Sequence, residues 1–356
     1  MSPDCKPAIW FPAVRATTGA DVYIETLAAQ LRRRGLCAEI TWLPLRAEYA
    51  PWTVPVPKPP AWANVVQVNT WLHRRFIPEN LPVVATVLHC VHDSAFRCYK
   101  NLAQTLYHRV HIKPMERRVL ERASAIVAIS QYTAERTQAA FGTTGIEVIP
   151  PAVDPAGPYH AAARTAPNKP FRLLFAGSGS RRKGVDLLVP IMERLGPNFE
   201  LIVVGTSTIG TPALPPNVHI KGRLPGADDL AVAYRNADAL LFPSRLEGFG
   251  LVAAEAMACG LPVIATRGSS LTEVVEDGVT GTLCPQDDVD AFASAARQLA
   301  ADTRLAEAMS HAAQLRVADI FSVERMLDAY VRLYARCVHS VRTGRVPQAV
   351  RIGGNP

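Results

Sequence analysis

Two glutamates, Glu247 and Glu255, stand eight positions apart in the stretch FPSRLEGFGLVAAEAMACGLPVIA, residues 242–265. Glu247 falls in a glycine-flanked loop directly after DALLFPS, an apolar run typical of a buried strand. The carboxyl ends of parallel strands are where α/β sheets bind their ligands. The sequence therefore predicts that Glu247 faces a substrate.

Glu255 lies in an Ala-rich run that predicts a core helix. A buried, unpaired carboxylate is costly, so Glu255 needs a partner. Two alternatives stay open from the residues alone. The partner is either a pair of ligand hydroxyls or a structural group, an arginine or a backbone N–H.

Two glycine-rich turns are suited to hold an anion. The first, in FRLLFAGSGSRRKGVDLL, runs from a predicted strand into a helix, and its amides at 177–180 are joined by Arg181, Arg182 and Lys183. The second begins at Gly248, and the amides of 249–251 lead into the helix that carries Glu255. For the first turn, a tight turn with solvated arginines remains the other interpretation.

The first turn does not fit two better-known phosphate motifs. Its glycines follow G-x-G-x-x-x-x-G, and the next strand, FELIVVG, ends without the acidic residue that would hold a dinucleotide ribose. Lys183 is followed by Gly184 instead of Ser or Thr, which excludes a triphosphate P-loop.

The elements that position these residues alternate between strand-like and helix-like runs along the whole chain, which predicts parallel, doubly wound α/β sheets. A Pro- and Ala-rich stretch at 155–170 predicts a linker. We expect two Rossmann-like domains, 1–160 and 166–320, that face a central cleft. A last helix at about 322–340 is expected to pack back on the first domain, and 341–356 to be a disordered tail.

Composition narrows the class of protein. The chain of 356 residues is 49% hydrophobic and 19% charged and has no apolar run long enough to cross a membrane. Seven scattered cysteines without a C-x-x-C pair indicate reduced thiols in a cytosolic protein. The start shows no secretory signal pattern. The net charge of +7, concentrated in residues 1–165, favours an acidic partner, but no nucleic-acid motif accompanies it.

Several motifs in this order resemble one family. EGFGLVAAE followed by AMACGLPVIA is similar to the E-x7-E signature of the retaining glycosyltransferases of family four, which have the GT-B fold. The likeness extends over nearly the whole chain. Further segments that carry it are GADVYIETLAAQLRRRG, IEVIPPAVDPAGPY, FAGSGSRRKGVDLL, NVHIKGRL and EVVEDGVTGTLCPQDD.

The resemblance implies a role for each matching residue. Glu247 would accept hydrogen bonds from the donor sugar, Glu255 would hold the nucleotide ribose, and Lys183 would bind the diphosphate. His89, at the end of VVATVLH, would be the cleft histidine near the transferred sugar, and His92 or Asp93 are alternatives to it. The remaining donor-binding positions are Gly19 and Ala20 in the first domain and Ser178, Arg182, Phe249, Gly250, Leu251 and Val252 in the second.

Two positions depart from the family pattern. Ser178 stands where relatives carry an arginine on the diphosphate, and Arg181 or Arg182 would have to replace it. The pair Gly19-Ala20 stands where two glycines are common. The variant turn resembles a subset that acts on lipopolysaccharide cores.

The implied reaction transfers a hexose-type sugar from a nucleoside diphosphate to an acceptor hydroxyl, and keeps the anomeric configuration. No Asp-x-Asp motif is present, and the pairs Asp228-Asp229 and Asp287-Asp288 fit helix starts or turns, so we expect no metal and no cofactor. A binding protein with weak or no turnover is the alternative. The sequence does not identify the donor base, the sugar or the acceptor.

The segment 95–123 carries seven Lys or Arg against two Glu, with three aromatic residues. A basic aromatic helix of this kind can lie on anionic lipid, although a solvated face over the core is an equal alternative. Together with an envelope glycan or lipid-linked acceptor, this predicts a cytoplasmic protein at the inner face of the cytoplasmic membrane.

Overall fold

The computed structural model describes residues 6–154, 156–161, 167–210 and 214–343, and the chain forms two compact units. Unit 1 comprises residues 1–151 and 324–356, and unit 2 comprises residues 152–323. Most of the predicted tail, from residue 344 onward, and part of the predicted linker lie outside the described residues.

Unit 1 is built on a parallel six-stranded sheet in the order β2-β1-β3-β4-β5-β6. Its four central strands are rich in valine, isoleucine and alanine and are buried on both faces, as expected where helices cover a parallel sheet, whereas the two edge strands are partly exposed. The strands are β1 (Ala8–Val14), β2 (Cys37–Leu43), β3 (Val65–Asn69), β4 (Val83–Val87), β5 (Ala125–Ala128) and β6 (Ile146–Val148).

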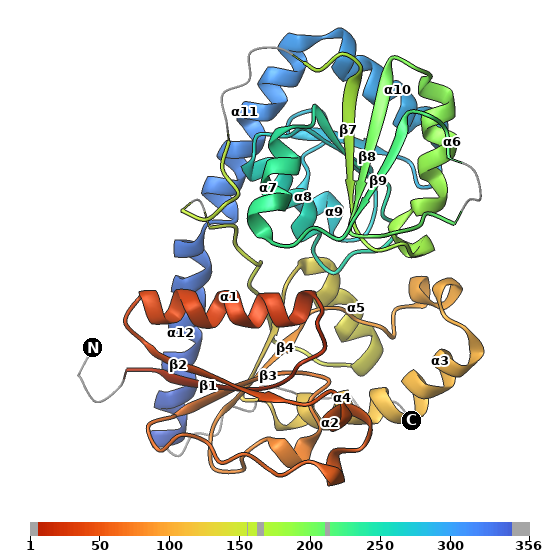
Figure 1. The fold of residues 1–356 in the computed structure, drawn as a ribbon. Coiled ribbons are helices and arrows are strands. Elements are labelled where there is room, and N and C mark those ends of the chain that lie inside the picture. The colour runs from red at the N-terminus through yellow and green to blue at the C-terminus, as the bar shows by residue number, and fades with distance from the viewer. Residues whose placement is uncertain (1–5, 155, 162–166, 211–213, 344–356) are drawn as a thin grey trace. The chain divides into compact units, whose positions relative to one another are not determined.

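Helices lie on both faces of the unit 1 sheet, with α1 on one face and α4 on the other (Figure 1). Thr18 caps α1, because its hydroxyl accepts a hydrogen bond from the amide of Ala20. The helical elements up to residue 151 are α1 (Gly19–Arg33), α2 (Arg46–Tyr49), η2 (Pro51–Thr53), η3 (Arg74–Phe76), η4 (Ser94–Tyr99), α3 (Leu102–Tyr107), η5 (His108–Ile112), α4 (Lys113–Arg122) and α5 (Gln131–Phe141).

The last helix, α12 (Val323–Arg342), packs on unit 1 although it follows unit 2 in the sequence. Tyr330 and Tyr334 are fully buried and stacked with ring centroids 5.5 Å apart. Tyr330 forms a hydrogen bond with Tyr23 of α1, and Tyr334 donates one to Gln67 of β3. These contacts anchor the helix to the sheet and to its covering helix.

Unit 2 holds a second parallel six-stranded sheet, in the order β12-β11-β10-β7-β8-β9. This is the strand order of the dinucleotide-binding fold, in which the first and fourth strands of the domain are neighbours at the centre. The strands are β7 (Phe171–Ala176), β8 (Phe199–Val204), β9 (Val218–Gly222), β10 (Ala239–Phe242), β11 (Val263–Thr266) and β12 (Gly281–Cys284).

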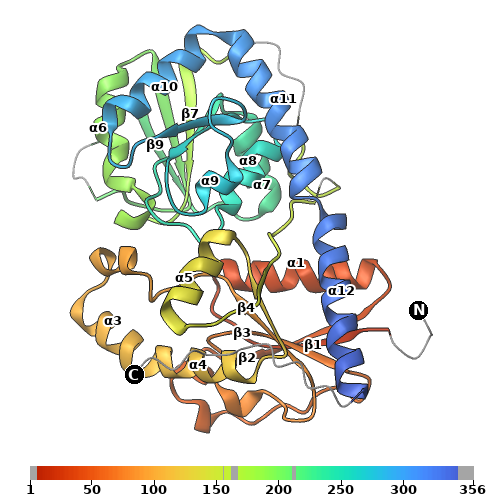
Figure 2. The same cartoon turned by 180° about the vertical axis from the view of Figure 1, so that it is seen from behind.

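Helices also cover both faces of this sheet. Figures 1 and 2 show α6 and α10 on one face and α7 and α8 on the other. The prediction of two doubly wound α/β domains is therefore confirmed. The helical elements are η6 (Arg181–Lys183), α6 (Val185–Leu195), α7 (Ala227–Arg235), α8 (Leu251–Ala258), α9 (Leu271–Val274), α10 (Val289–Ala301) and α11 (Thr303–Ile320).

One predicted element is different in the structure. The segment 95–123 is not a single helix. The short helix η4 comes first, and after Asn101 one continuous helical run follows, in which α3 passes through the π-helical turn η5 into α4. Asn101 starts α3 with a capping box to Gln104, which separates it from η4. Phe96, Arg97 and Tyr99 thus lie on η4, whereas the other basic and aromatic residues, Lys100 apart, lie on the longer run 102–122.

Candidate functional site

The site in unit 2 forms where the strand order reverses. β7 and β10 are hydrogen-bonded neighbours, and the chain leaves β7 and β10 toward helices on opposite faces of the sheet. The turn after β7 carries Lys183, and the loop after β10 carries Glu247. Such a reversal point is the ligand crevice of open α/β sheets, and here it brings together residues 64 positions apart.

Lys183 and Glu247 form the centre of this site. The Lys183 ammonium lies 2.5 Å from Glu247 Oε1, and the Ser244 hydroxyl donates to the same oxygen at 2.6 Å. Arg182 approaches the other carboxylate oxygen at 3.8 Å. The first carboxylate predicted from the sequence therefore lies beside the predicted phosphate-binding lysine.

Glu247 is buried and remains ionised. Burial by itself would raise its pKa, but the charges of Lys183 and Arg182 and the hydrogen bonds from Lys183 and Ser244 hold the pKa below its ordinary value. Its backbone is fixed as well. The Glu247 amide donates to Ser269 Oγ at 3.1 Å, and the Ser270 hydroxyl donates to the Glu247 carbonyl at 3.1 Å.

Two glycines are required by the close approach of these loops. Gly184 has φ +73°, and a Cβ there would lie 2.1 Å from the carbonyl oxygen of Pro243. Gly250 has φ +97°, and a Cβ there would lie 2.7 Å from Leu271. Only glycine fits both constraints, so Gly184 lets the turn after β7 pack against the loop after β10, and Gly250 lets the start of α8 pack against α9.

Arg245 was not singled out from the sequence, yet it ties the same two loops together. It is buried and makes a two-pronged ion pair with Asp186, at 2.7 and 2.9 Å. It also contacts Asp287 at 2.5 Å. A single arginine between two aspartates gives no signal in the sequence, because the three residues meet only when the strands are assembled.

The start of α8 supplies backbone amides at this edge. Gly250 is the N-cap, and the first amides of a helix have no partner within it. The side chain of Phe249 is buried against Phe321, with ring centroids 5.2 Å apart. Of the predicted stretch 249–252, Phe249 thus offers its backbone only, and Leu251 and Val252 begin the helix.

Glu255 is buried in α8 and has structural partners. The Tyr234 hydroxyl donates to Glu255 Oε2 at 3.1 Å, and Tyr159 forms a second hydrogen bond with the carboxylate. Burial raises the pKa of Glu255 to about 7, although both tyrosines lower it. The sequence did not single out either tyrosine.

Arg181 and Arg182, the two arginines that follow Ser178 in the turn after β7, have different surroundings. Arg181 is 82% exposed and lies 3.8 Å from Asp186, whereas the half-buried Arg182 donates to the carbonyl of Leu246 at 2.5 Å. Ser178 itself is exposed and contacts Ser180 at 3.3 Å. Arg182 is thus the arginine directed toward Glu247.

The predicted residues of unit 1 lie at the carboxyl ends of its own strands. His89 follows β4 and packs against the ring of Phe96, with centroids 5.0 Å apart. His92 is bound to the buried Glu116 at 2.7 Å, and Asp93 accepts hydrogen bonds from Tyr132 and from the amide of Ala95. His92 and Asp93 are therefore engaged in structural contacts.

Gly19 begins α1 at the turn after β1, as predicted. Part of this turn is already occupied by a side chain, because the Asp21 carboxylate accepts hydrogen bonds from the amides of Ala16 and Thr17. The phosphate contact expected at Gly19 and Ala20 stays a prediction.

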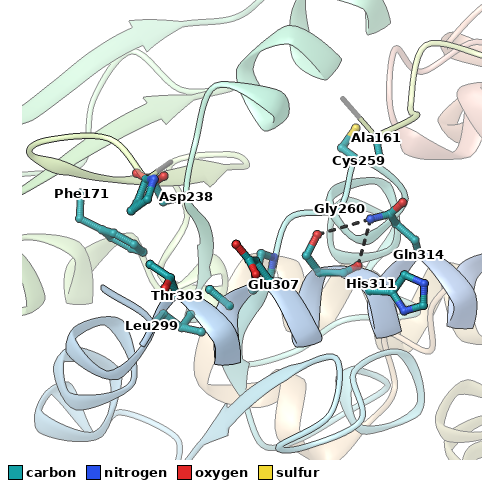
Figure 3. Close-up of a pocket in the computed structure, with 14 residues that line it drawn as sticks. Ala161, Phe171, Asp238, Cys259, Gly260, Leu299, Thr303, Glu307, His311 and Gln314 are labelled. Carbon is teal, nitrogen blue, oxygen red and sulfur yellow. Dashed lines mark hydrogen bonds between the residues drawn. The ribbon is translucent and has the colours of Figure 1, made fainter. Parts of the chain in front are cut away.

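A cavity of about 220 Å³ lies elsewhere in unit 2, at the amino ends of β7, β10 and β11. Figure 3 shows that Glu307 and His311 of α11 line it together with Cys259 at the end of α8. It opens at the opposite sheet edge from Lys183 and Glu247, so it is separate from the candidate site.

Comparisons with known protein families agree with this architecture. Residues 17–156 match the model of Glycosyltransferase Family 4, and residues 160–316 match that of Glycosyl transferases group 1. The chain therefore carries the domains of both families. The two family domains follow one another along the chain, and Lys183, Glu247 and Glu255 fall in the group 1 domain.

Curated relatives match the chain only in part. The chain is 35% identical over 251 residues to D-inositol 3-phosphate glycosyltransferase of Xylanimonas cellulosilytica, covering 62% of this chain and 60% of that protein. It is 33% identical over 229 residues to GDP-mannose-dependent alpha-(1-6)-phosphatidylinositol monomannoside mannosyltransferase of Mycolicibacterium smegmatis, covering 54% and 57%. The match thus spans less than two thirds of each relative's length.

The likeness in fold to a solved structure extends over nearly the whole chain. Sucrose-phosphate synthase of Thermosynechococcus elongatus superposes with a TM-score of 0.74 at 20% identity, covering 94% of this chain and all of that one. The GT-B fold predicted from the motifs is confirmed. Among the helices that the structure describes, none is long and apolar enough to cross a membrane.

Proposed function

We propose that the chain is a glycosyltransferase that transfers a hexose-type sugar from a nucleoside-diphosphate donor to an acceptor hydroxyl. The observation that carries the proposal is the cluster of Lys183, Arg182 and ionised Glu247 at the reversal point of the unit 2 sheet. This cluster offers cations for a diphosphate and a carboxylate for sugar hydroxyls.

Each residue has a defined task in this proposal. Lys183 and Arg182 neutralise the diphosphate, assisted by the amides at the start of α8. Glu247 accepts hydrogen bonds from the transferred sugar, and Glu255 accepts them from the ribose. Arg182 takes the place of the arginine that relatives carry at Ser178, because it is held beside Glu247 whereas Arg181 extends into solvent.

Donor binding changes the contacts of Lys183. In the structure its ammonium is paired with Glu247. A diphosphate adds a second anion within reach, and an ammonium group has three donors, so Lys183 can bind phosphate and carboxylate together. The pair also fixes Glu247 in the orientation in which it meets the sugar.

The reaction keeps the anomeric configuration in this proposal. The bond between the anomeric carbon and the diphosphate oxygen breaks, and its electron pair goes to that oxygen. The acceptor oxygen bonds to the same face of the carbon and passes its proton to the departing phosphate. The cations stabilise the developing phosphate charge without a metal ion.

The decisive experiment measures nucleotide release from UDP-, GDP- and ADP-sugars, with and without glycan acceptors. Hydrolysis or transfer from one of these donors, lost in Lys183→Ala, supports the transferase. Tight binding of a nucleotide sugar without any turnover instead supports the second candidate, a nucleotide-sugar-binding protein of the same fold.

For the acceptor we propose an envelope glycan or a lipid-linked saccharide at the inner face of the cytoplasmic membrane. The mannosyltransferase relative is named after phosphatidylinositol monomannoside, which is a lipid. The loops of unit 1 offer a surface for such an acceptor. In the chain, α2, η3 and α3 come after the carboxyl ends of β2, β3 and β4, the strands that precede His89.

Apolar side chains are exposed on these loops. Leu102, Leu106 and Val110 follow one another at helical spacing on α3 and η5 and are 90%, 63% and 65% exposed. Trp52 of η2 is 71% exposed, and Tyr49 at the end of α2 is also exposed. Aromatic and aliphatic residues of this kind bury themselves at a lipid interface.

The two exposed sets are on neighbouring elements. His111 of η5 lies 3.2 Å from the carbonyl of Glu48 in α2, and Arg75 donates to the carbonyl of Pro51 at 2.8 Å. Cations gather beside them. Burial lowers the pKa of His73, and the charges of its neighbours lower it further. Those neighbours are Arg74, Arg75, His111 and Arg118.

We propose that this surface docks on anionic lipid, with the apolar side chains in the interface and the arginines near the headgroups. Co-sedimentation with vesicles of anionic and of neutral lipid tests it. The double variant Trp52→Ser and Leu106→Ser should lose binding to anionic vesicles, and Arg74→Gln should weaken it by about 1 kcal/mol.

The matched control is Leu315→Ser, at a leucine of α11 in unit 2 that is 56% exposed. It should bind anionic vesicles like the wild type. Absence of wild-type binding to either vesicle would rule out the membrane surface and leave a water-soluble glycan as the acceptor.

A further inference from the structure

The inference concerns the two tyrosines around Glu255, and it rests on the proposed function. Tyr234 is the penultimate residue of α7 and fully buried, and Tyr159 belongs to the segment that precedes β7. Their rings meet edge to face with centroids 6.0 Å apart. Both hydroxyls are directed to the same carboxylate.

The segment that carries Tyr159 is fixed to α7. Arg235, directly after Tyr234, donates to the carbonyl of Pro158, directly before Tyr159, at 2.8 Å. The two tyrosines are therefore positioned as one unit. Burial raises the pKa of each hydroxyl well above its ordinary value, so both keep their proton and donate.

Glu255 is not fully satisfied by these two donors. An ionised carboxylate offers about four acceptor positions, and the tyrosines occupy two of them. The pKa of Glu255 still rises to about 7, because burial outweighs the two hydrogen bonds. The ionised form therefore gains from further donors, and the neighbouring 2′ and 3′ hydroxyls of a ribose are a matched pair.

We propose that Tyr159 and Tyr234 are positioning residues that hold Glu255 ionised and oriented for the ribose of the donor nucleotide. They act through the carboxylate and do not touch the sugar that is transferred. Nucleotide affinity then depends on pH through Glu255, and each tyrosine shifts that dependence toward lower pH.

The test is calorimetric binding of UDP, GDP and ADP between pH 5.5 and 9 to the full chain. In Tyr159→Phe the carboxylate loses one donor, so its titration moves to higher pH. With the nucleotide that the wild type binds, we expect affinity roughly five-fold weaker at pH 7 and within about two-fold of the wild type at pH 9. Tyr234→Phe should behave alike.

Tyr334→Phe is the matched control. Tyr334 is another buried tyrosine with one side-chain acceptor, Gln67, but it lies in unit 1. The Tyr334→Phe variant should lower the free energy of unfolding and leave the pH dependence of nucleotide affinity unchanged. The control thus separates an effect on stability from an effect on the orientation of Glu255.

Three outcomes decide the matter. A shifted profile in both tyrosine variants, absent from the control, supports the inference. Normal wild-type binding with an unshifted profile in Tyr159→Phe and Tyr234→Phe overturns the inference alone. Absence of nucleotide binding by the wild type at every pH overturns the proposed function and the inference together.

Discussion

At the scale of single residues, the candidate site depends on two carboxylates in opposite states. Glu247 is stabilised in its ionised form by cations and donors, whereas Glu255 is surrounded by neutral tyrosines and its pKa lies at about 7. The same residue type thus serves as a permanent anion in one place and as a titrating group in the other, because the neighbours differ in charge.

Lys183→Ala tests the cationic part of the site. The substitution removes the charge that faces the departing phosphate, so we expect turnover of the nucleotide sugar to fall by about 100-fold or more. Steady-state release of nucleotide measures it. Arg304→Ala, at an exposed position of α11, is the control and should keep wild-type turnover; near wild-type rates in Lys183→Ala would remove the lysine from the mechanism.

Glu255→Gln tests the titrating carboxylate through stability. Because the folded pKa of about 7 lies above the ordinary value, the folded protein keeps a proton that the unfolded chain releases. The contribution of this proton to the free energy of unfolding is fully present below the pKa of the unfolded chain. It is lost as pH rises through the folded pKa of about 7.

The variant has no such group, so its stability relative to the wild type should increase from pH 5 to pH 8. Urea unfolding of both proteins across this range measures the difference. A constant difference in unfolding free energy would contradict the assignment of the titration to Glu255.

At the scale of elements, helix α12 shows how a distant segment becomes part of a domain. Its tyrosines lie against β3 and α1, and the hydrogen bond from Tyr334 to Gln67 satisfies a buried amide. A buried polar side chain that loses its partner costs more than the hydrogen bond itself contributes.

Tyr334→Phe should therefore lower the unfolding free energy of unit 1 by about 1–3 kcal/mol. Denaturant unfolding followed by a probe in unit 1 measures it. Tyr49→Phe, at an exposed tyrosine, is the control and should change stability by less than about 0.5 kcal/mol. An unchanged midpoint in Tyr334→Phe would show that this hydrogen bond contributes nothing to the docking of α12.

At the scale of the whole molecule, the charges that would serve a diphosphate all come from the chain itself. Lys183 and Arg182 lie within 4 Å of Glu247, and the start of α8 adds its amides. A donor bound there has two protein cations available, so the proposal requires no divalent ion.

We therefore expect turnover to persist in EDTA, within about two-fold of the rate without chelator, a change under 0.5 kcal/mol in barrier height. The measurement is nucleotide release after exhaustive dialysis against EDTA, with added Mg²⁺ as the comparison. A rate abolished by EDTA and restored by Mg²⁺ would overturn metal independence.

The sequence by itself determined the parts that depend on local pattern. Apolar runs between glycine-rich turns identified most strands of both sheets. The turn with Lys183, the loop with Glu247 and the helix with Glu255 follow those strands in the sequence. It failed where helix boundaries are set by a capping residue, as at Asn101, which divides the segment 95–123. It also gave no sign of β12 and α11 as separate elements.

Only the tertiary structure decided which of these residues meet. Lys183 and Glu247 are 64 positions apart and come together because β7 and β10 are neighbours in the sheet. The same strand order places Arg245 between its two aspartates and brings Tyr159 and Tyr234 to Glu255. Spacing along the chain carries no information about such contacts, because they depend on the order in which strands pair.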